Sequence, residues 1–145
     1  MQFILNAIGT VRNPYTDRPP GGWVTAESEI TLELEFAKGL DGLEGYSHLF
    51  VLFYFDRAGR MTLRRRPQND PRLPVVGIFA TRRPERPNPI GLSLVRLLRI
   101  EGNVLTVRGL DCYNGTPVLD LKPYLPPRDR PAGVSVPVWL STQTK

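Results

Sequence analysis

The feature that most constrains the fold is a two-residue alternation of apolar and polar side chains. In residues 29–36, EITLELEF, every even position is apolar and every odd position is glutamate or threonine. Side chains separated by two residues lie on the same face of a strand, whereas a helix repeats every 3.6 residues. We therefore expect a half-buried strand over 29–36 rather than a helix.

Other segments extend the β pattern. Residues 48–55, HLFVLFYF, are apolar almost throughout and predict a fully buried central strand, and VVGIFA (75–80) predicts a short buried one. A hairpin is expected where LSLVRLLRI and VLTVRGL flank a turn at Glu101–Asn103. VSVPVWL (134–140) predicts a closing strand at an edge or bulge, because Pro137 lacks an N–H group. The one helix expected is short, around 37–45, and its glycines weaken it.

Length and composition limit the architecture. A chain of 145 residues with 41% hydrophobic and 23% charged residues fits one soluble domain over 1–145. It has no apolar run of transmembrane length and no signal-peptide pattern. The single cysteine, Cys112, excludes an internal disulfide and suits a cytoplasmic location. We expect a mainly β, single-domain antiparallel barrel-like fold with long proline-rich loops and no additional C-terminal domain.

The charge predicts an anionic partner. The net charge is +5 and the isoelectric point is about 9.8, and nucleic acid is the commonest partner of such a surface. A basic surface without a binding role is the alternative. Arginine is concentrated in residues 63–72 and 81–87, and its planar guanidinium suits two-pronged contacts with phosphate or carboxylate.

The second arginine segment lies in an unusually stiff loop. ATRRPERPNPIGLS (80–93) holds three arginines and three prolines between two expected core strands. Prolines restrict the backbone, and Gly91 permits the close approach of another group. A rigid charged loop is a suitable binding device, although a solvated turn would have the same composition.

Common catalytic signatures are absent. The sequence contains no P-loop, dinucleotide-binding, zinc-protease or serine-hydrolase motif. His48, the only histidine, fits a structural role better than that of a base, and no metal site is expected. A polar group on one strand face remains: Asp120, Lys122 and Tyr124 alternate in LDCYNGTPVLDLKPYLP (110–126) and can bind a polar ligand or move a proton. An exposed ion pair is the alternative.

Four segments together resemble the TsaA-like (VirR- and TrmO-type) proteins, which are S-adenosylmethionine-dependent methyltransferases. They are IGTVRNPY (8–15), GLEGYSHLFVLFYF (42–55), GIFATRRPERPNPIGLS (77–93) and NGTPVLDLKPYLP (114–126), in the family's order. The third is long and unusual, so a chance match is improbable. The resemblance implies a small β-barrel, a homodimer, and methylation of N6 of threonylcarbamoyladenosine at tRNA position 37.

The resemblance also implies functional residues. The amine that is methylated must lose a proton, so the polar strand face is the expected catalytic group, and the arginine segments are the expected RNA contacts. Catalytic roles are expected for Asp120, Lys122 and Tyr124, and RNA contacts for Arg64, Arg65, Arg66, Arg83 and Arg86. Cofactor contacts are expected for Pro20, Gly21, Gly22, Asp56, Arg57, Arg82, Leu92, Leu110, Asp111 and Cys112.

The chain departs from the family pattern in places. Asp56 stands where histidine is common, Asn114 stands where aspartate is common, and longer bacterial members carry a C-terminal domain. The C-terminal domain is the difference that bears most on the expected tRNA substrate. Two alternatives therefore stay open: a methyltransferase that acts on a small molecule, and an RNA-binding barrel without catalytic activity.

Overall fold

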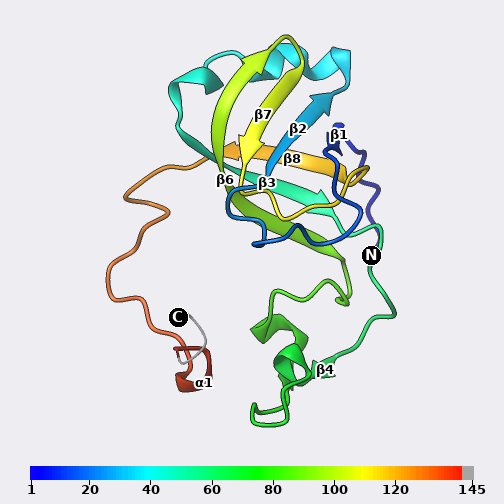
Figure 1. The fold of residues 1–145 in the computed structure, drawn as a ribbon, viewed down its shortest axis with the longest axis vertical. Helices are drawn as coiled ribbons and strands as arrows, with labels where there is room; N and C mark the ends of the chain where they lie inside the picture. Colours follow the sequence, from blue (N-terminus) through cyan, green and yellow to red (C-terminus); the bar gives the residue numbers. More distant parts are fainter. Residues whose placement is uncertain (142–145) are drawn as a thin grey trace. The chain divides into compact units, whose positions relative to one another are not determined.

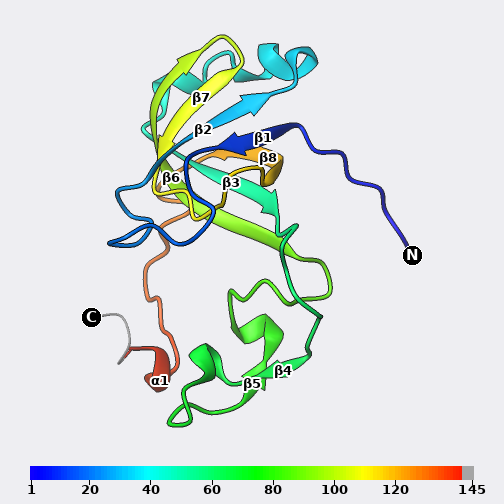
Figure 2. The same ribbon diagram turned by 45° about the vertical axis from the view of Figure 1, so that its right-hand side comes forward.

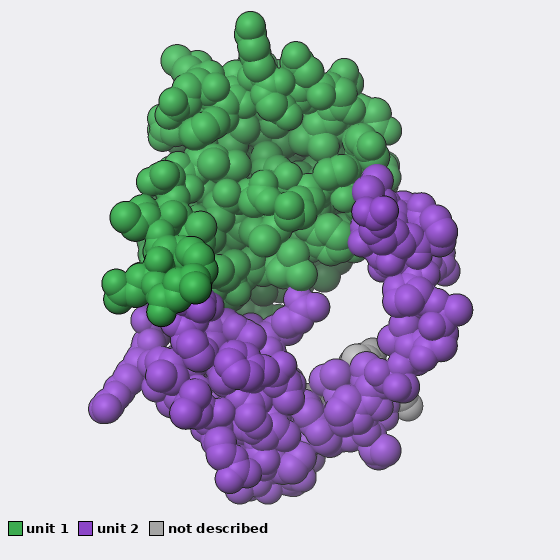
Figure 3. All heavy atoms as spheres, turned by 180° about the vertical axis from the view of Figure 1, so that it is seen from behind, with its two compact units in different colours: residues 1–57, 90–124 green, residues 58–89, 125–145 purple. Residues whose placement is uncertain are grey.

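The computed structural model describes residues 1–141 and divides the chain into two compact units, coloured separately in Figure 3. The barrel unit comprises Met1–Arg57 and Ile90–Tyr124. The arginine-rich unit comprises Ala58–Pro89 and the described residues that follow Tyr124. The expectation that residues 1–145 act as one domain stays a prediction.

The barrel unit is a closed antiparallel barrel with the strand order β1-β2-β7-β6-β3-β8 (Figures 1 and 2). Closure comes from the first and last strands, since Gly9 pairs with Val118. A closed barrel leaves no sheet edge unpaired. The mainly β, barrel-like fold is therefore confirmed. The strands are β1 (Gly9–Arg12), β2 (Glu27–Leu32), β3 (His48–Tyr54), β6 (Ile90–Glu101), β7 (Val104–Arg108) and β8 (Pro117–Pro123).

Alternate side chains of each strand fill the barrel. In β3, Leu49, Val51 and Phe53 are buried in the core, whereas the residues between them face outward and keep part of their surface exposed. The strand expected over 48–55 is confirmed to Tyr54, but the expectation that it is fully buried was wrong. Only one face of β3 lines the core.

Gly91 is required by the packing of the barrel. A Cβ atom at this position would lie 2.3 Å from the ring of Phe53, which is the directly opposite residue on β3. No substituent fits at that distance, so the ring packs against the bare backbone of β6. The close approach expected at Gly91 is therefore made by a core side chain.

The strand expected over 29–36 ends early. β2 stops at Leu32, where its partner β1 begins at Gly9 and where the β6–β7 turn supplies Asn103 as the last neighbour. Beyond these partners the chain forms the 3-10 helices η1 (Leu34–Leu40) and η2 (Leu43–Gly45), so the expected strand was wrong after Leu32. The short helix expected around 37–45 is present as these two 3-10 helices.

The expected hairpin is confirmed. β6 and β7 pair from Arg96 opposite Arg108 to Glu101 opposite Val104, and Gly102 takes a positive φ of 62° in the turn. Such a φ is readily available to glycine.

The arginine-rich unit contains little regular structure. Its two-stranded sheet joins β4 (Arg64–Arg65) to β5 (Val76–Gly77). The buried strand expected over 75–80 was wrong outside Val76–Gly77, and these two residues are not buried. The chain turns into η4 after Gly77, where both the amide and the hydroxyl of Thr81 donate to the Ile78 carbonyl. The remaining elements are the 3-10 helices η3 (Pro67–Asn69) and η4 (Ile78–Ala80) and the helix α1 (Val138–Ser141).

The closing strand expected over 134–140 was also wrong. Residues 134–137 have no regular structure, and α1 begins at Val138. The Pro137 carbonyl accepts hydrogen bonds from the amides of Leu140 and Ser141, which forms a helical turn. In residues 1–141, no helix combines the length and apolar character needed to cross a membrane.

Candidate cofactor site

Three loops leave the same end of the barrel. They are residues 13–26 between β1 and β2, residues 55–57 after β3, and residues 109–116 between β7 and β8. They emerge together because β1, β3 and β7 run antiparallel to their neighbours β2, β6 and β8. The resemblance places most of its expected cofactor residues in these three loops.

Arg57 connects the three loops. Its Nη1 donates to the Thr16 carbonyl over 3.0 Å, and its guanidinium carbon lies 4.4 Å from the centre of the Tyr113 ring. The Tyr113 ring contacts Trp23 edge-on at 5.5 Å, and Trp23 contacts Tyr15 at 5.6 Å. This cation–π and aromatic stack fixes the position of Arg57. The sequence pattern did not identify these three aromatic residues, although Tyr15 follows Pro14 and Trp23 follows Gly22 in a loop.

Asn13 attaches the first loop to the third. Its Nδ2 donates both to Ser28 Oγ and to the Cys112 carbonyl, each over 2.9 Å, and its backbone N–H donates to Asn114 Oδ1 over 3.2 Å. The departure at Asn114 therefore has a local role, since its side-chain oxygen accepts this hydrogen bond. The loop geometry is thus held by specific polar contacts.

The third loop carries a destabilised carboxylate. Asp111 keeps an exposed surface, yet partial desolvation by the surrounding loops raises the pKa of its carboxyl, against the opposing effect of the Arg18 charge. Burial, together with the negative charges of Asp111 and Asp56, raises the pKa of the Cys112 thiol far above its usual range. Cys112 is therefore an unreactive core residue. A cationic ligand near Asp111 would stabilise its charged form.

The first loop presents backbone to this region. Gly21 and Gly22 both have a φ of +81°, and the amide of Gly22 donates to the Pro19 carbonyl in a tight turn. A side chain at either position would be strained. Nothing lies within 4 Å of the place where a Cβ of Gly21 would stand, so a ligand can approach the backbone closely.

Other expected cofactor residues have different surroundings. Leu110 is completely buried in the barrel core, so only its backbone is available to a ligand. Leu92 lies on the outer face of β6, opposite Leu52 and 44% exposed. Arg82 is exposed and belongs to the arginine-rich unit. The cofactor roles of all three stay predictions.

The expected catalytic residues lie mostly away from the cofactor end. Asp120 and Lys122 form an exposed ion pair of 2.9 Å on the outer face of β8. The Tyr124 amide donates to the His48 carbonyl at the start of β3, which is the opposite end of the barrel. At about 3.3 Å per residue, Tyr124 is roughly 20 Å along the strand from Pro117. Within a single barrel, Tyr124 and the three loops lie at opposite ends. The assignment of catalytic roles stays a prediction.

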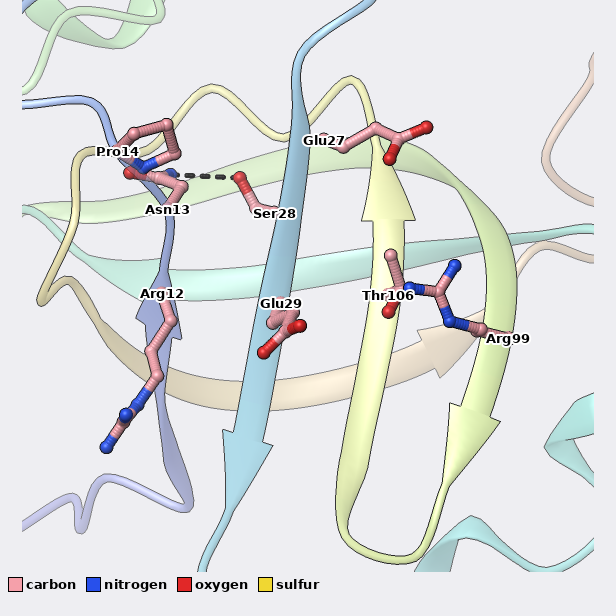
Figure 4. Close-up of a pocket in the computed structure, with 8 residues that line it drawn as sticks. All are labelled: Arg12, Asn13, Pro14, Glu27, Ser28, Glu29, Arg99 and Thr106. Carbon is pink, nitrogen blue, oxygen red and sulfur yellow. Dashed lines mark hydrogen bonds between the residues drawn. The ribbon is translucent and has the colours of Figure 1, made fainter.

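A separate hollow of about 340 Å³ lies on the outer surface of strands β1, β2, β6 and β7 (Figure 4). Four of its residues are paired in register, one on each strand: Arg12, Glu29, Thr106 and Arg99. None of the expected cofactor residues lines it. Its walls are charged and open, unlike the apolar clefts that hold small molecules, so we do not assign the cofactor to it.

The fold and the loop cluster define a class of protein: a small closed β-barrel with a ligand site built from loops at one end. A family model described as the tRNA-methyltransferase O N-terminal domain matches residues 11–130. The chain belongs to this family, as the resemblance predicted.

Relatives and solved structures agree with this assignment. A probable S-adenosyl-L-methionine-binding protein of Methanothermobacter thermautotrophicus is 44% identical over 128 residues, which are 86% of this chain and 91% of the relative. The human tRNA (adenine(37)-N6)-methyltransferase is 44% identical over 101 residues, 68% of this chain and 23% of that protein. A crystal structure of TrmO superposes with a TM-score of 0.78 at 36% identity and covers 94% of this chain and 64% of that one. The chain spans 33% of one archaeal relative and 91% of another.

The names of these relatives agree with the expected cofactor, and the loop cluster fits it. S-adenosylmethionine carries a sulfonium and an ammonium group, for which Asp111 and Asp56 are suitable partners. It also carries a carboxylate, for which Arg57 and the backbone amide of Gly21 are suitable donors. The desolvation of Asp111 is the observation that supports this fit.

Proposed function

We propose that the protein is an S-adenosylmethionine-dependent methyltransferase that methylates N6 of threonylcarbamoyladenosine at position 37 of tRNA. The observation that carries the proposal is the convergence of three loops on Arg57, with the desolvated Asp111 beside them. Family membership supports the reaction class, and the human relative's name supports the tRNA base. The reducing cytoplasm is the location that this substrate implies.

The bound cofactor would supply an electrophilic methyl group. Methyl transfer of this kind depends mainly on positioning, because the nucleophile must approach the methyl carbon in line with the bond that breaks. Arg57, held by Thr16 and Tyr113, would hold the carboxylate of the cofactor, and Asp111 would balance its positive charge. The adenine amine must lose a proton, which Asp120 or Tyr124 would accept or relay.

A homodimer completes this proposal. The outer face of β3 and β6 carries a row of apolar side chains that no other described segment of the barrel covers. Tyr54 is 43%, Leu92 44% and Leu94 47% exposed. Leu92 is also an expected cofactor residue, and Asp120 and Lys122 border the row on β8. A second copy on this face would bury the row and bring the partner's polar strand to a cofactor site that its own barrel leaves remote.

Calorimetry tests the cofactor site. Tyr113→Leu removes the ring that supports Arg57 and should weaken S-adenosylmethionine binding about tenfold, roughly the 1–2 kcal/mol of a desolvated cation–π contact. Tyr113→Phe keeps the ring and should bind as the wild type does. Arg82→Ala should also weaken binding. Wild-type protein that releases no heat, when a control methyltransferase does, would refute the cofactor assignment.

Two further measurements test the acceptor and the assembly. Mass spectrometry of tRNA nucleosides from cells with and without the gene should show the methylated base only when the gene is present. If label from the cofactor reaches a small molecule and not bulk tRNA, the alternative substrate class is correct. Light scattering at tens of micromolar should give a dimeric mass, and Leu94→Arg should give a monomeric one.

A further inference from the structure

The arginines of the arginine-rich unit divide into two groups by their contacts. Residues 58–89 contain eight arginines and two acidic residues. Most of the eight are occupied within the unit, which leaves fewer for a ligand than the sequence implies. The arginines whose side chains bind a carboxylate or a carbonyl are Arg65, Arg66, Arg72, Arg83 and Arg86.

Glu85 and backbone carbonyls hold the occupied group. The Glu85 side chain, only 16% exposed, lies 3.5 Å from Arg65 and 3.3 Å from Arg83. Arg86 Nη1 donates to the carbonyls of Thr81 and Arg83 over 3.1 Å. These arginines stabilise the loop, so replacing Arg83 or Arg86 would disturb its structure as well as its charge. The RNA contacts expected for them stay predictions.

Two arginines beside the loop are unoccupied. Among the described residues, no carboxylate lies within 4.0 Å of Arg60 or Arg64, and neither side chain makes a hydrogen bond. Both are exposed. The segment that carries them runs along the loop, since the Thr62 amide donates to the Glu85 carbonyl and Arg64 pairs with Gly77.

An exposed aromatic ring lies just after the strand that pairs with Arg64. Phe79 is 76% exposed, the most exposed aromatic side chain of this unit. It lies in η4, two residues after the Arg64–Gly77 pair. The turn that carries it is rigid, because the Thr81 hydroxyl donates to the Ile78 carbonyl over 2.7 Å and Arg86 binds the Thr81 carbonyl. An exposed ring held by such a turn can stack on a flat partner without being reordered.

We infer that Phe79, Arg60 and Arg64 form a docking face for an unpaired RNA segment, in which a base stacks on the ring and the guanidiniums contact the flanking phosphates. Charge complementarity favours RNA over an apolar protein partner, since the two acids of residues 58–89, Asp70 and Glu85, are both occupied by arginine. Stacking on aromatic side chains is the usual recognition of unpaired bases. The inference rests on the proposed tRNA substrate and adds the residues that would hold the unpaired loop.

Fluorescence anisotropy with two RNA probes tests the stacking. The probes are an anticodon stem-loop and a fully paired duplex of the same stem. Phe79→Leu should bind the stem-loop about tenfold more weakly than the wild type and the duplex equally. Phe79→Trp should restore stem-loop binding, and Val75→Ala, a change at another exposed apolar residue (42%) of the unit, should have no effect.

Salt dependence tests the phosphate contacts. Changing both Arg60 and Arg64 to alanine should weaken both RNAs and reduce the slope of log affinity against log salt by about one to two. Arg72→Ala, which removes an arginine already paired with Asp70, should change the slope less.

The outcomes separate the two proposals. If the wild type prefers the stem-loop and Phe79→Leu binds it equally well, the inference is wrong and the tRNA substrate stands. If the wild type binds S-adenosylmethionine but neither RNA, both the tRNA substrate and the docking face are wrong. If Phe79→Leu lowers the mass in light scattering, the ring is a subunit contact, which overturns the inference.

Discussion

The two units of this chain are stabilised by different interactions. The barrel unit encloses a cluster of buried apolar side chains, among them Val11, Ile30, Leu49 and Leu105, each 0% exposed. In residues 58–89 the buried apolar side chains are Leu73, Ile78 and Pro67. There, Glu85 and backbone carbonyls bind arginines instead. Four buried polar atoms that lack a hydrogen-bond partner among the described residues, Thr62 Oγ1, Arg65 Nε, Arg83 Nε and Glu85 Oε2, belong to this same cluster.

The difference implies that the barrel unit is more stable than the arginine-rich unit. Apolar burial contributes most of the free energy of folding, so the barrel can hold its loops in a fixed geometry. Partly exposed ion pairs contribute less and weaken in salt. We therefore expect the arginine-rich unit to open locally before the barrel does.

The largest effect should follow from a cavity in the barrel core. Leu105→Ala removes a fully buried side chain and should lower the free energy of unfolding by about 2–5 kcal/mol, through lost burial and an unfilled cavity. Urea unfolding measures the change. Leu63→Ala, at a residue 62% exposed in the arginine-rich unit, is the matched control and should change it little. Equal effects at both positions would contradict the proposed difference between the units.

A smaller effect should follow from the loss of Glu85. Glu85→Gln leaves Arg65 and Arg83 without a counter-charge in a largely buried cluster and should cost about 1–2 kcal/mol, reduced by partial exposure. Hydrogen exchange should show lost protection in residues 58–89 and unchanged protection in the barrel strands. Glu101→Gln, in the exposed Arg99–Glu101 pair, should leave both units protected. Loss of barrel protection in Glu85→Gln would show that the units unfold together.

A pH-dependent effect is expected at Asp111. Because desolvation raises the pKa of this carboxyl in the folded state, its charged form destabilises the fold. The penalty is absent below the ordinary pKa of 3.8, grows as the pH rises from there through the raised folded pKa, and is complete above the folded value. Asp111→Asn should therefore be more stable than the wild type at neutral pH and equally stable below that ordinary value. Thermal unfolding across pH measures this, and calorimetry should show weaker binding of S-adenosylmethionine. A variant of unchanged stability and unchanged affinity would contradict the role given to Asp111.

The smallest effect is expected at the surface of the arginine-rich unit. Hydrogen bonds from Arg72 lower the pKa of Asp70 to about 2. Stability from this pair should be present above the ordinary pKa of 3.8 and lost as the pH falls toward 2. Arg72 is 86% exposed, so salt should remove most of the effect. Arg72→Ala should leave the unfolding midpoint at neutral pH unchanged in 1 M salt, where screening acts within about 3 Å. A midpoint shift that persists there would show that the pair is structural.

Local sequence pattern predicted the elements whose partners are near in sequence or whose faces differ in polarity. The β6–β7 hairpin follows from its turn residues, and β3 follows from an apolar run long enough for a strand. The pattern did not predict where β2 ends, because Leu32 is the last residue with neighbours on both sides, and those neighbours come from distant segments. The residues 134–140 are apolar at alternate positions, yet no strand is available to pair with them.

For the candidate site, the sequence by itself determined which segments are involved, because the residues of the resemblance lie in 20–22, 56–57 and 110–112. Only the tertiary structure brought these loops to one end of the barrel, since strand pairing decides which ends adjoin. It also showed that Tyr15, Trp23 and Tyr113 support Arg57. Composition determined the positive charge, but the folded contacts decided that Asp70, Glu85 and carbonyl groups bind five of the eight arginines in residues 58–89. Arg60 and Arg64 are among the three that have no side-chain partner in the described part of the chain. A side chain's charge is a property of its residue type, whereas its availability depends on neighbours that only folding assembles.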